Sequence, residues 1–226
     1  MVQLAAGTLK TLVRTHLQAL HTSSWLSSHF RKNYQHPMAI DVKPESVIEV
    51  LSKAGIKFML MGTHAVNVYR EQARATQDVD VLVRTKDVAK AIKALSKAFP
   101  GLTINHTPVV ARFVDPATEK VVLDVMKPNQ GVLKIAFRYT RAVDQMHNVP
   151  DLEMTLVSKF AAMVSPNRRP DKKMIDGGDF MNVVMFNRQH IDLKKLRRLA
   201  EKVYRGAGKE ILEMINTIDA GRTLEL

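Results

Sequence analysis

The fold is indicated most clearly by Gly62-Thr63-His64-Ala65-Val66 and by Thr76-Gln77-Asp78-Val79-Asp80-Val81-Leu82-Val83 a few residues later. The second segment alternates polar and apolar residues and then becomes fully aliphatic, which is typical of a strand. Side chains two residues apart on a strand point to the same face, so we expect the carboxylates of Asp78 and Asp80 to lie side by side. Adjacent carboxylates repel each other and are costly to desolvate unless a cation lies between them. The pattern therefore predicts a Mg²⁺ site, because this hard cation prefers carboxylate oxygens and substrate phosphates.

The pair Gly62-Thr63 lies between a short apolar segment and a helical one. A glycine at such a turn allows a phosphate to approach backbone N–H groups at the start of the helix. The alternative is structural, with Thr63 acting only as an N-cap. For Asp78 and Asp80, the alternative is a solvated strand edge that binds no metal.

Taken together, Gly62-Thr63, an apolar helix, and Arg74-x-Thr76-x-Asp78-x-Asp80 resemble the DNA polymerase-beta-like nucleotidyltransferase superfamily. Within it, the chain looks most like the small AbiEii-type and minimal nucleotidyltransferases. The resemblance covers about residues 44–190 and is strongest over residues 58–83. It implies an enzyme that moves an NMP from an NTP, such as ATP, to an acceptor hydroxyl with two Mg²⁺ ions. The implied acceptor is RNA such as tRNA, or else a protein.

A third carboxylate is expected on a neighbouring strand. Asp124 is the single charged residue in Val121-Val122-Leu123-Asp124-Val125-Met126. A lone Asp in an apolar strand is costly unless it meets a charge or a metal. By the resemblance it corresponds to the third catalytic Asp, which helps to hold metal and to activate the attacking hydroxyl. The alternative is that Asp124 faces solvent at a sheet edge.

The resemblance also implies roles for residues outside the carboxylates. Lys159 would contact the nucleotide phosphates, and Asp176 and Asp179 would support the site; the alternatives are a solvated helix lysine and acidic residues of a helix's first turn. The implied catalytic and metal-binding residues are Asp78, Asp80 and Asp124. The implied nucleotide-binding residues are Gly62, Thr63, Arg74, Thr76 and Lys159.

The charge of the chain is uneven. The net charge is +12, and residues 168–209 hold twelve basic and five acidic side chains. Such an imbalance favours contact with a polyanion through release of counterions. The alternative is an ordinary solvated helix face. The predicted nucleic-acid patch consists of Lys194, Lys195, Arg197, Arg198, Lys202 and Arg205, opposite an apolar stripe of leucines.

Composition sets further bounds. The 226 residues are enough for one domain with a small helical companion, and the absence of cysteine excludes disulfides and thiolate metal sites. No apolar run approaches the ~20 residues of a membrane span. Residues 1–40 contain no Asp or Glu, which is typical of a mitochondrial transit segment or of a basic amphipathic helix packed on the core. We expect a cytoplasmic protein, or a mitochondrial one if residues 1–40 are a transit segment. The oligomeric state stays open.

The predicted fold class is α+β, a nucleotidyltransferase-like mixed sheet with flanking helices followed by a C-terminal helical region. The predicted domains are the extension 1–40, the core 41–150 and the helical region 151–226. Predicted helices span residues 44–54, 63–70, 85–99, 152–164, 174–187, 192–205 and 207–217. Predicted strands span residues 57–61, 77–83, 102–105, 109–114 and 119–126, and residues 127–150 fit helix or strand.

Two other functions stay open from the sequence. One is a catalytically silent nucleotidyltransferase-like domain that binds RNA through its basic tail. The other is a toxin–antitoxin component that acts by binding a partner protein, which would require an exposed apolar surface. His64, at the predicted phosphate-binding turn, favours these alternatives because it is bulkier than the small residue that the resemblance leads us to expect.

Overall fold

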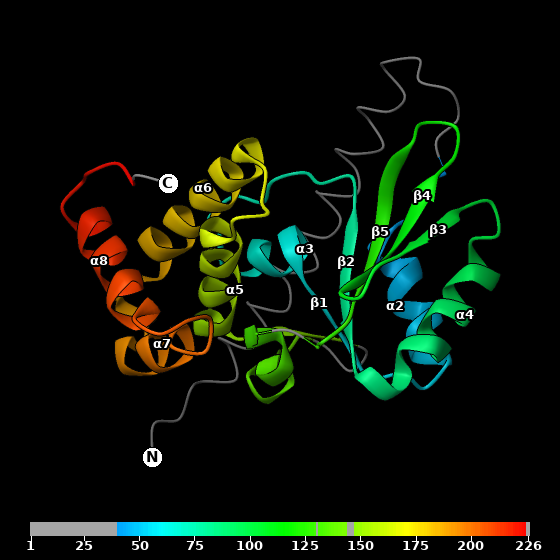
Figure 1. Cartoon of the computed structure of the whole chain (residues 1–226), viewed down its shortest axis with the longest axis horizontal. Coiled ribbons are helices and arrows are strands. Elements are labelled where there is room, and N and C mark those ends of the chain that lie inside the picture. The colour runs from blue at the N-terminus through cyan, green and yellow to red at the C-terminus, as the bar shows by residue number, and fades with distance from the viewer. Residues whose placement is uncertain (1–39, 130, 144–146, 225–226) are drawn as a thin grey trace. The chain divides into compact units, whose positions relative to one another are not determined.

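The computed structural model describes residues 40–129, 131–143 and 147–224 (Figure 1). Within them the chain forms two compact units. The first comprises residues 40–68, 72–129, 141–143 and 147–149, and the second comprises residues 69–71, 131–140 and 150–224. The predicted N-terminal extension lies outside the described residues except for Ile40.

The first unit is built on a mixed sheet of seven strands in the order β3-β4-β5-β2-β1-β7-β6. Strand β2 lies near its centre, parallel to β5 and antiparallel to β1. Both neighbours are rich in aliphatic residues, so this part of the sheet is buried. The strands are β1 (Phe58–Leu60), β2 (Val79–Val83), β3 (Thr103–His106), β4 (Val110–Asp115), β5 (Lys120–Met126), β6 (Thr140–Ala142) and β7 (Asn148–Pro150).

Three helices accompany the sheet: α2 (Pro44–Lys53), α3 (Gly62–Val66) and α4 (Val88–Ala98), with 3-10 turns at Asn67–Tyr69 and Thr85–Asp87. Helix α2 begins with a proline at its first turn, where the missing N–H is not needed. It buries Val47, Ile48 and Leu51, and it packs against α4, which in turn contacts β5. Short α3 follows β1 directly and contacts β2.

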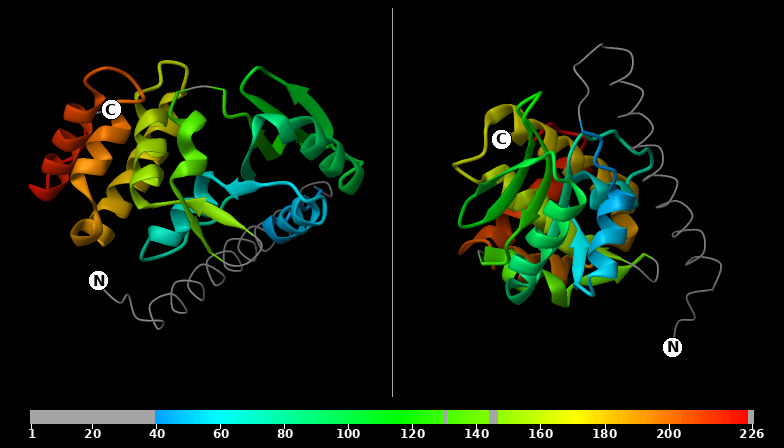
Figure 2. Two further views of the ribbon diagram at one scale, coloured as in Figure 1. Left: turned by 90° about the horizontal axis from the view of Figure 1, so that it is seen from below. Right: turned by 90° about the vertical axis from the view of Figure 1, so that its right-hand side faces the viewer.

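The second unit is helical. Helix α5 begins after Asp151, whose carboxylate accepts a hydrogen bond from the Met154 N–H at 3.0 Å. It is buried along most of its length and packs against α6 and α7. Figure 2 shows α7 and α8 side by side at the end of the colour range. The elements are a 3-10 segment (Gly131–Arg138), α5 (Leu152–Val164), α6 (Pro170–Asn187), a 3-10 turn (Arg188–His190), α7 (Leu193–Ala200) and α8 (Ala207–Asp219).

Residues 69–71 belong to this second unit because of their hydrogen bonds. The Tyr69 hydroxyl donates to the Pro150 carbonyl at 2.8 Å, and Asn187 Nδ2 donates to the Tyr69 carbonyl at 2.6 Å. The chain therefore enters the helical unit briefly between α3 and β2 and then returns to the sheet.

The predicted α+β class, with a mixed sheet, flanking helices and a helical C-terminal region, is confirmed. When the 3-10 turn Thr85–Asp87 is counted with α4, most element starts agree with the sequence prediction to within one residue, and two differ by more. Strand β2 begins at Val79 and not at Gln77, because the Asp78 side chain bonds locally to the Thr76 hydroxyl. Helix α6 begins at Pro170 and not near residue 174, because proline is well suited to the first helical position.

The predicted helix over residues 192–205 is too long, because α7 ends at Ala200. The Glu201 carboxylate turns forward and accepts hydrogen bonds from Gly206 N–H and Gly208 N–H, both at 3.0 Å. A Cβ at Gly208 would lie 2.8 Å from the Arg197 carbonyl oxygen, so α8 can start this close to α7 only with glycine there. The ambiguous segment 127–150 contains a 3-10 helix and two short strands. None of the helices in the described part of the chain combines the length and apolar character that a membrane span requires.

Candidate active site

The turn after β1 fits closely around Asp80. Gly62 has φ +56, and a Cβ placed on it would lie 1.9 Å from Asp80 Oδ2. Such a distance is impossible, and positive φ is itself unfavourable for other residues. The Asp80 main chain is held too, since Met61 N–H donates to its carbonyl at 2.8 Å. Gly62 is therefore required by the position of the Asp80 carboxylate.

The strand register places a row of charged residues across three strands. Asp80 on β2 pairs with Asp124 on β5 in parallel register, and Asp124 pairs with Arg112 on antiparallel β4. Cross-strand partners share one face of a sheet, so these three side chains lie on the same face. The predicted proximity of Asp80 and Asp124 is confirmed at the level of the backbone register.

Asp124 is an unusual carboxyl. Its pKa is raised to about 6, mainly by burial; Arg112 acts against this shift, and the nearby Asp78 carboxylate adds to it. Arg112 Nε lies 3.6 Å from Asp124 Oδ2, but half of the Arg112 side chain is exposed and the distance is long. The other oxygen, Oδ1, is buried and has no hydrogen-bond partner among the described residues. The sheet-edge alternative is wrong, because Asp124 lies on an interior strand, between β2 and β4.

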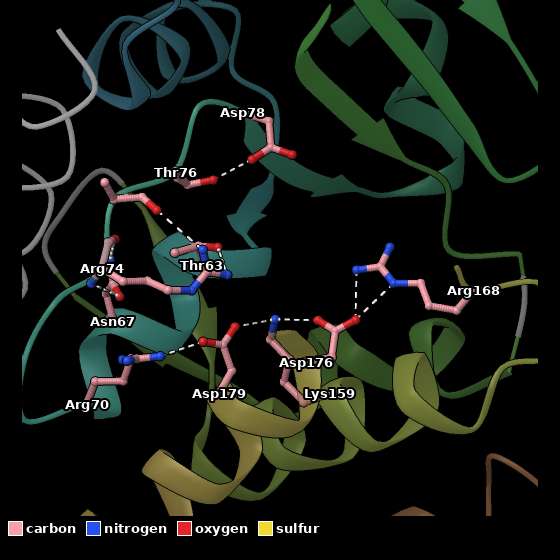
Figure 3. A network of polar contacts seen from close by, with 11 residues as sticks. Thr63, Asn67, Arg70, Arg74, Thr76, Asp78, Lys159, Arg168, Asp176 and Asp179 are labelled. Atoms are coloured by element: carbon pink, nitrogen blue, oxygen red, sulfur yellow. Dashed lines mark hydrogen bonds and ion pairs between the residues drawn. The ribbon is translucent and has the colours of Figure 1, made fainter. Parts of the chain in front are cut away.

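Thr63, Arg74, Thr76 and Asp78 take part in two polar contacts (Figure 3). Arg74 Nη2 donates to the Thr63 hydroxyl at 2.8 Å, and the Thr76 hydroxyl donates to the Asp78 carboxylate. Asn67 fixes the Arg74 main chain from both sides, donating to its carbonyl at 3.0 Å and accepting from its N–H at 3.1 Å. The N-cap interpretation of Thr63 is wrong, because α3 already begins at Gly62 and the hydroxyl contacts Arg74.

His64 is buried in α3, with 3% of its surface exposed. Burial lowers its pKa to about 4, and the Asp78 carboxylate and a hydrogen bond with the Asp78 backbone act against that shift. At neutral pH the imidazole is therefore uncharged. It supports the main chain that carries Asp78.

The carboxylates fit a hard divalent cation by their chemistry. Three Asp oxygen donors from two strands and the preceding loop, together with the unpartnered Asp124 Oδ1, are what Mg²⁺ or Mn²⁺ would satisfy. Over the described residues, however, no three His, Asp or Glu side chains converge on one point at metal-binding distance. Binding of a cation would therefore require the Asp78, Asp80 and Asp124 side chains to move closer together.

In the second unit, Lys159, Asp176 and Asp179 form a buried ionic network (Figure 3). Lys159 Nζ lies 2.8 Å from one oxygen of each carboxylate. Arg168 Nη2 lies 2.8 Å from Asp176, and Arg70 contacts Asp179. The solvated alternative for Lys159 is wrong, since its side chain is 10% exposed. Asp176 and Asp179 neutralise it, and its predicted contact with nucleotide phosphates stays a prediction.

The predicted nucleic-acid patch is divided by the structure. Lys195 is partly buried and contacts Asp151 at 2.8 Å and Glu153 at 2.7 Å, so it joins α7 to the start of α5. Lys202 and Arg205 lie in the turn after α7 and not on the helix. The residues of the patch that are exposed are Lys194, Arg197, Arg198, Lys202 and Arg205.

Sequence reasoning missed several residues of these networks. Arg112 was missed because its relation to Asp124 depends on the β4–β5 register, which no local pattern encodes. Asn67 and Arg70 were missed because the sequence around them, after a short helix, contains no motif that indicates a functional role. Arg168 lies in the basic turn that the sequence does show, but its contact with Asp176 depends on where α6 begins.

Comparison with known proteins gives a distant likeness only. No protein-family model matches the chain, and no curated protein matches it. Among solved structures, an antigenic nucleotidyltransferase-like protein from Paracoccidioides brasiliensis is 17% identical, with 80% of this chain and 94% of that chain covered and a TM-score of 0.44. A putative nucleotidyltransferase from H. pylori is 14% identical, with 78% and 92% covered and a TM-score of 0.46. The Megavirus polyadenylate synthase is 12% identical, with 84% and 46% covered and a TM-score of 0.47.

These structures are too distant to support a functional inference, so the function is inferred from the residues of the site. The AbiEii-type part of the resemblance stays a prediction.

Replacing Asp124 with Asn should stabilise the metal-free protein at pH 8. The pKa of Asp124 is about 6 in the folded chain, against an ordinary 3.8. Protonation of Asp124 therefore favours the folded state, and this contribution to stability is fully present below pH 3.8 and is lost as the pH rises through 6. The gain of Asp124→Asn over wild type should therefore grow from near zero at pH 4 to at most about 3 kcal/mol at pH 8.

Urea unfolding with EDTA across this pH range measures the effect. The exposed variant Asp171→Asn is the control, because the pKa of Asp171 is lowered by Arg169 and no gain is expected there. A loss of stability in Asp124→Asn at pH 8 would contradict the interpretation.

Replacing Lys159 with Met should destabilise the protein by about 3–5 kcal/mol, because it leaves two buried carboxylates without their shared cation. Lys53→Met is the matched control, since the Lys53–Glu49 pair is exposed and should contribute little to stability. Chemical denaturation of the three proteins measures both changes. Equal stability of Lys159→Met and Lys53→Met would show that the buried network contributes little.

Proposed function

We propose that this protein is a nucleotidyltransferase of the DNA polymerase-beta-like superfamily that moves an NMP from an NTP to an acceptor hydroxyl with the help of Mg²⁺. The proposal rests on one observation: Asp80 and Asp124 are cross-strand partners, Gly62 lies against the Asp80 carboxylate, and Asp78 directly precedes β2. Carboxylates on adjacent interior strands, one with an unpartnered buried oxygen, are costly for folding alone. Such a cost is typical of a functional site.

Asp78, Asp80 and Asp124 would hold the cation, which would supply positive charge to the triphosphate and lower the pKa of the acceptor hydroxyl. Thr76 orients the Asp78 carboxylate by donating its hydroxyl. Arg74 is held by Asn67 and lies at the start of α3 against Thr63, so its guanidinium would attract the terminal phosphates. Gly62 leaves room for the phosphates to approach the backbone.

In the reaction, the acceptor oxygen forms a bond to the α-phosphorus while the bond from that phosphorus to the bridging oxygen breaks. Pyrophosphate leaves with the electron pair, and the hydroxyl proton passes to a carboxylate. By the resemblance to the superfamily, Asp124 is the carboxylate that would accept this proton. The exposed basic residues after α7 favour an RNA acceptor such as tRNA over a protein.

The proposal predicts that each labelled NTP, incubated with Mg²⁺, total tRNA and wild-type protein, gives label in RNA for at least one base. Asp78→Ala/Asp80→Ala should lower the rate by several orders of magnitude, as removal of charge stabilisation at a reacting phosphate usually does. Asp171→Asn is the control for a surface carboxylate and should keep full activity, because Asp171 is exposed and pairs with Arg169.

The location of the label identifies the acceptor. Label in RNA identifies the nucleotide and the RNA, whereas label in protein makes the acceptor a side chain. Turnover that survives in Asp78→Ala/Asp80→Ala would overturn the proposal. RNA binding without any turnover would favour the catalytically silent alternative.

A further inference from the structure

Helix α6 buries two carboxylates and exposes five large apolar side chains. Asp176 and Asp179 point inward to Lys159 and are 2% and 1% exposed. Of the six large apolar side chains that are most exposed in the described part of the chain, five lie on α6. These five, called here the α6 stripe, are Met174, Ile175, Met181, Met185 and Phe186.

The stripe consists of two groups, Met174 with Ile175 and Met181 with Met185 and Phe186, on either side of Gly178. At 3.6 residues per turn its members lie along one side of the helix, over a length of about 18 Å. Met174 is 71% exposed and Met185 is 66% exposed, so the two ends are open to solvent. Between them lies exposed Gly178, where a Cβ would meet nothing within 4 Å. No fully exposed position from Met174 to Phe186 carries a charge.

A surface of this kind indicates a binding site. Exposed apolar side chains are common singly, but a stripe of them with no interleaved charge is characteristic of an interface. Methionine adds to this inference, because its flexible, polarisable side chain adapts to a partner's surface.

The charge around the stripe defines its partner. Lys172 and Lys173 immediately precede Met174, and the exposed carboxylate before them, that of Asp171, is paired with Arg169. Residues 168–209 hold twelve basic side chains against five acidic ones. A second copy of the chain would bring the same positive charge, with a net +12 on each molecule. Residues 1–39 contain no Asp or Glu and so cannot supply the complementary charge. The complementary partner is acidic.

We infer that the α6 stripe binds an amphipathic helix of a partner protein, with an apolar face against the methionines and acidic residues beside Lys172 and Lys173. Helix-to-helix recognition of this kind uses apolar anchors at i, i+3, i+4 and i+7. A contact of this length buries less than a standard interface, so the association is expected to be transient. The inference does not depend on the proposed catalysis.

The test uses a synthetic amphipathic peptide of about four helical turns, with leucines on one face and glutamates on the other. Two matched peptides replace all glutamates with lysines or scramble the leucine positions. Fluorescence anisotropy with the full chain should show binding of the acidic amphipathic peptide alone. Met181→Gln/Met185→Gln and Lys172→Glu/Lys173→Glu should each weaken that binding about tenfold or more.

Lys90→Glu/Lys93→Glu is the charge-matched control, because both lysines are exposed on α4 in the first unit. It should bind the peptide as wild type does, and so should Asp78→Ala/Asp80→Ala, which separates this inference from the proposed function. The substituted methionines are exposed, and circular dichroism checks that each variant is folded.

Three results would overturn the inference. One is equal binding of the lysine peptide or of the scrambled peptide. Another is binding to phosphatidylserine vesicles in the absence of any binding to the acidic peptide. If Met181→Gln/Met185→Gln loses this vesicle binding, the stripe is a membrane contact. A third is a concentration-dependent dimer in sedimentation that the same variant loses, which would make the occupant a second copy.

Discussion

The contact between Gly62 and the Asp80 carboxylate is the constraint on which the candidate site depends. A Cβ at residue 62 would lie 1.9 Å from Asp80 Oδ2, so the Asp80 carboxylate can keep this position against the turn after β1 only with glycine there. The pairing of β2 with β5 places Asp124 next to Asp80 on the neighbouring strand. One residue without a side chain thus brings the predicted phosphate-binding turn to the carboxylates that would meet the phosphates.

Both units bury carboxyl groups, but they differ in how far neighbouring positive charges compensate those groups. In the helical unit, Asp176 and Asp179 are fully buried, and Lys159 and two arginines compensate their charge. In the sheet unit, Asp124 has a raised pKa, a distant arginine and one oxygen without a partner. Compensated buried charge is typical of a structural element, whereas uncompensated buried charge is typical of a site that receives a ligand. Because of this contrast, the proposed nucleotidyl transfer is placed in the sheet unit.

Much of the sheet could be predicted from the sequence, because period-two patterns and turn residues are local. The apolar strand around Asp124 was sufficient to predict that Asp124 lies on a strand next to that of Asp80, whereas a shared metal site stays a prediction. Arg112 could not be predicted, since strand register is set by tertiary pairing. The end of α7 at Ala200 depends on Glu201 and Gly208 meeting across a turn. The exposed α6 stripe could not be predicted either, because a helical pattern does not reveal which of its faces is buried.

The most direct test of this account is the Mn²⁺ affinity of wild type, Gly62→Ala and Gly55→Ala, measured by electron paramagnetic resonance on folded protein. Gly55 has φ +63, close to that of Gly62, but a Cβ there would meet nothing within 4 Å. Both variants therefore carry the same backbone strain, and only Gly62→Ala displaces the Asp80 carboxylate. We predict that Gly62→Ala loses Mn²⁺ binding while Gly55→Ala keeps it. Wild-type affinity in Gly62→Ala would contradict the account.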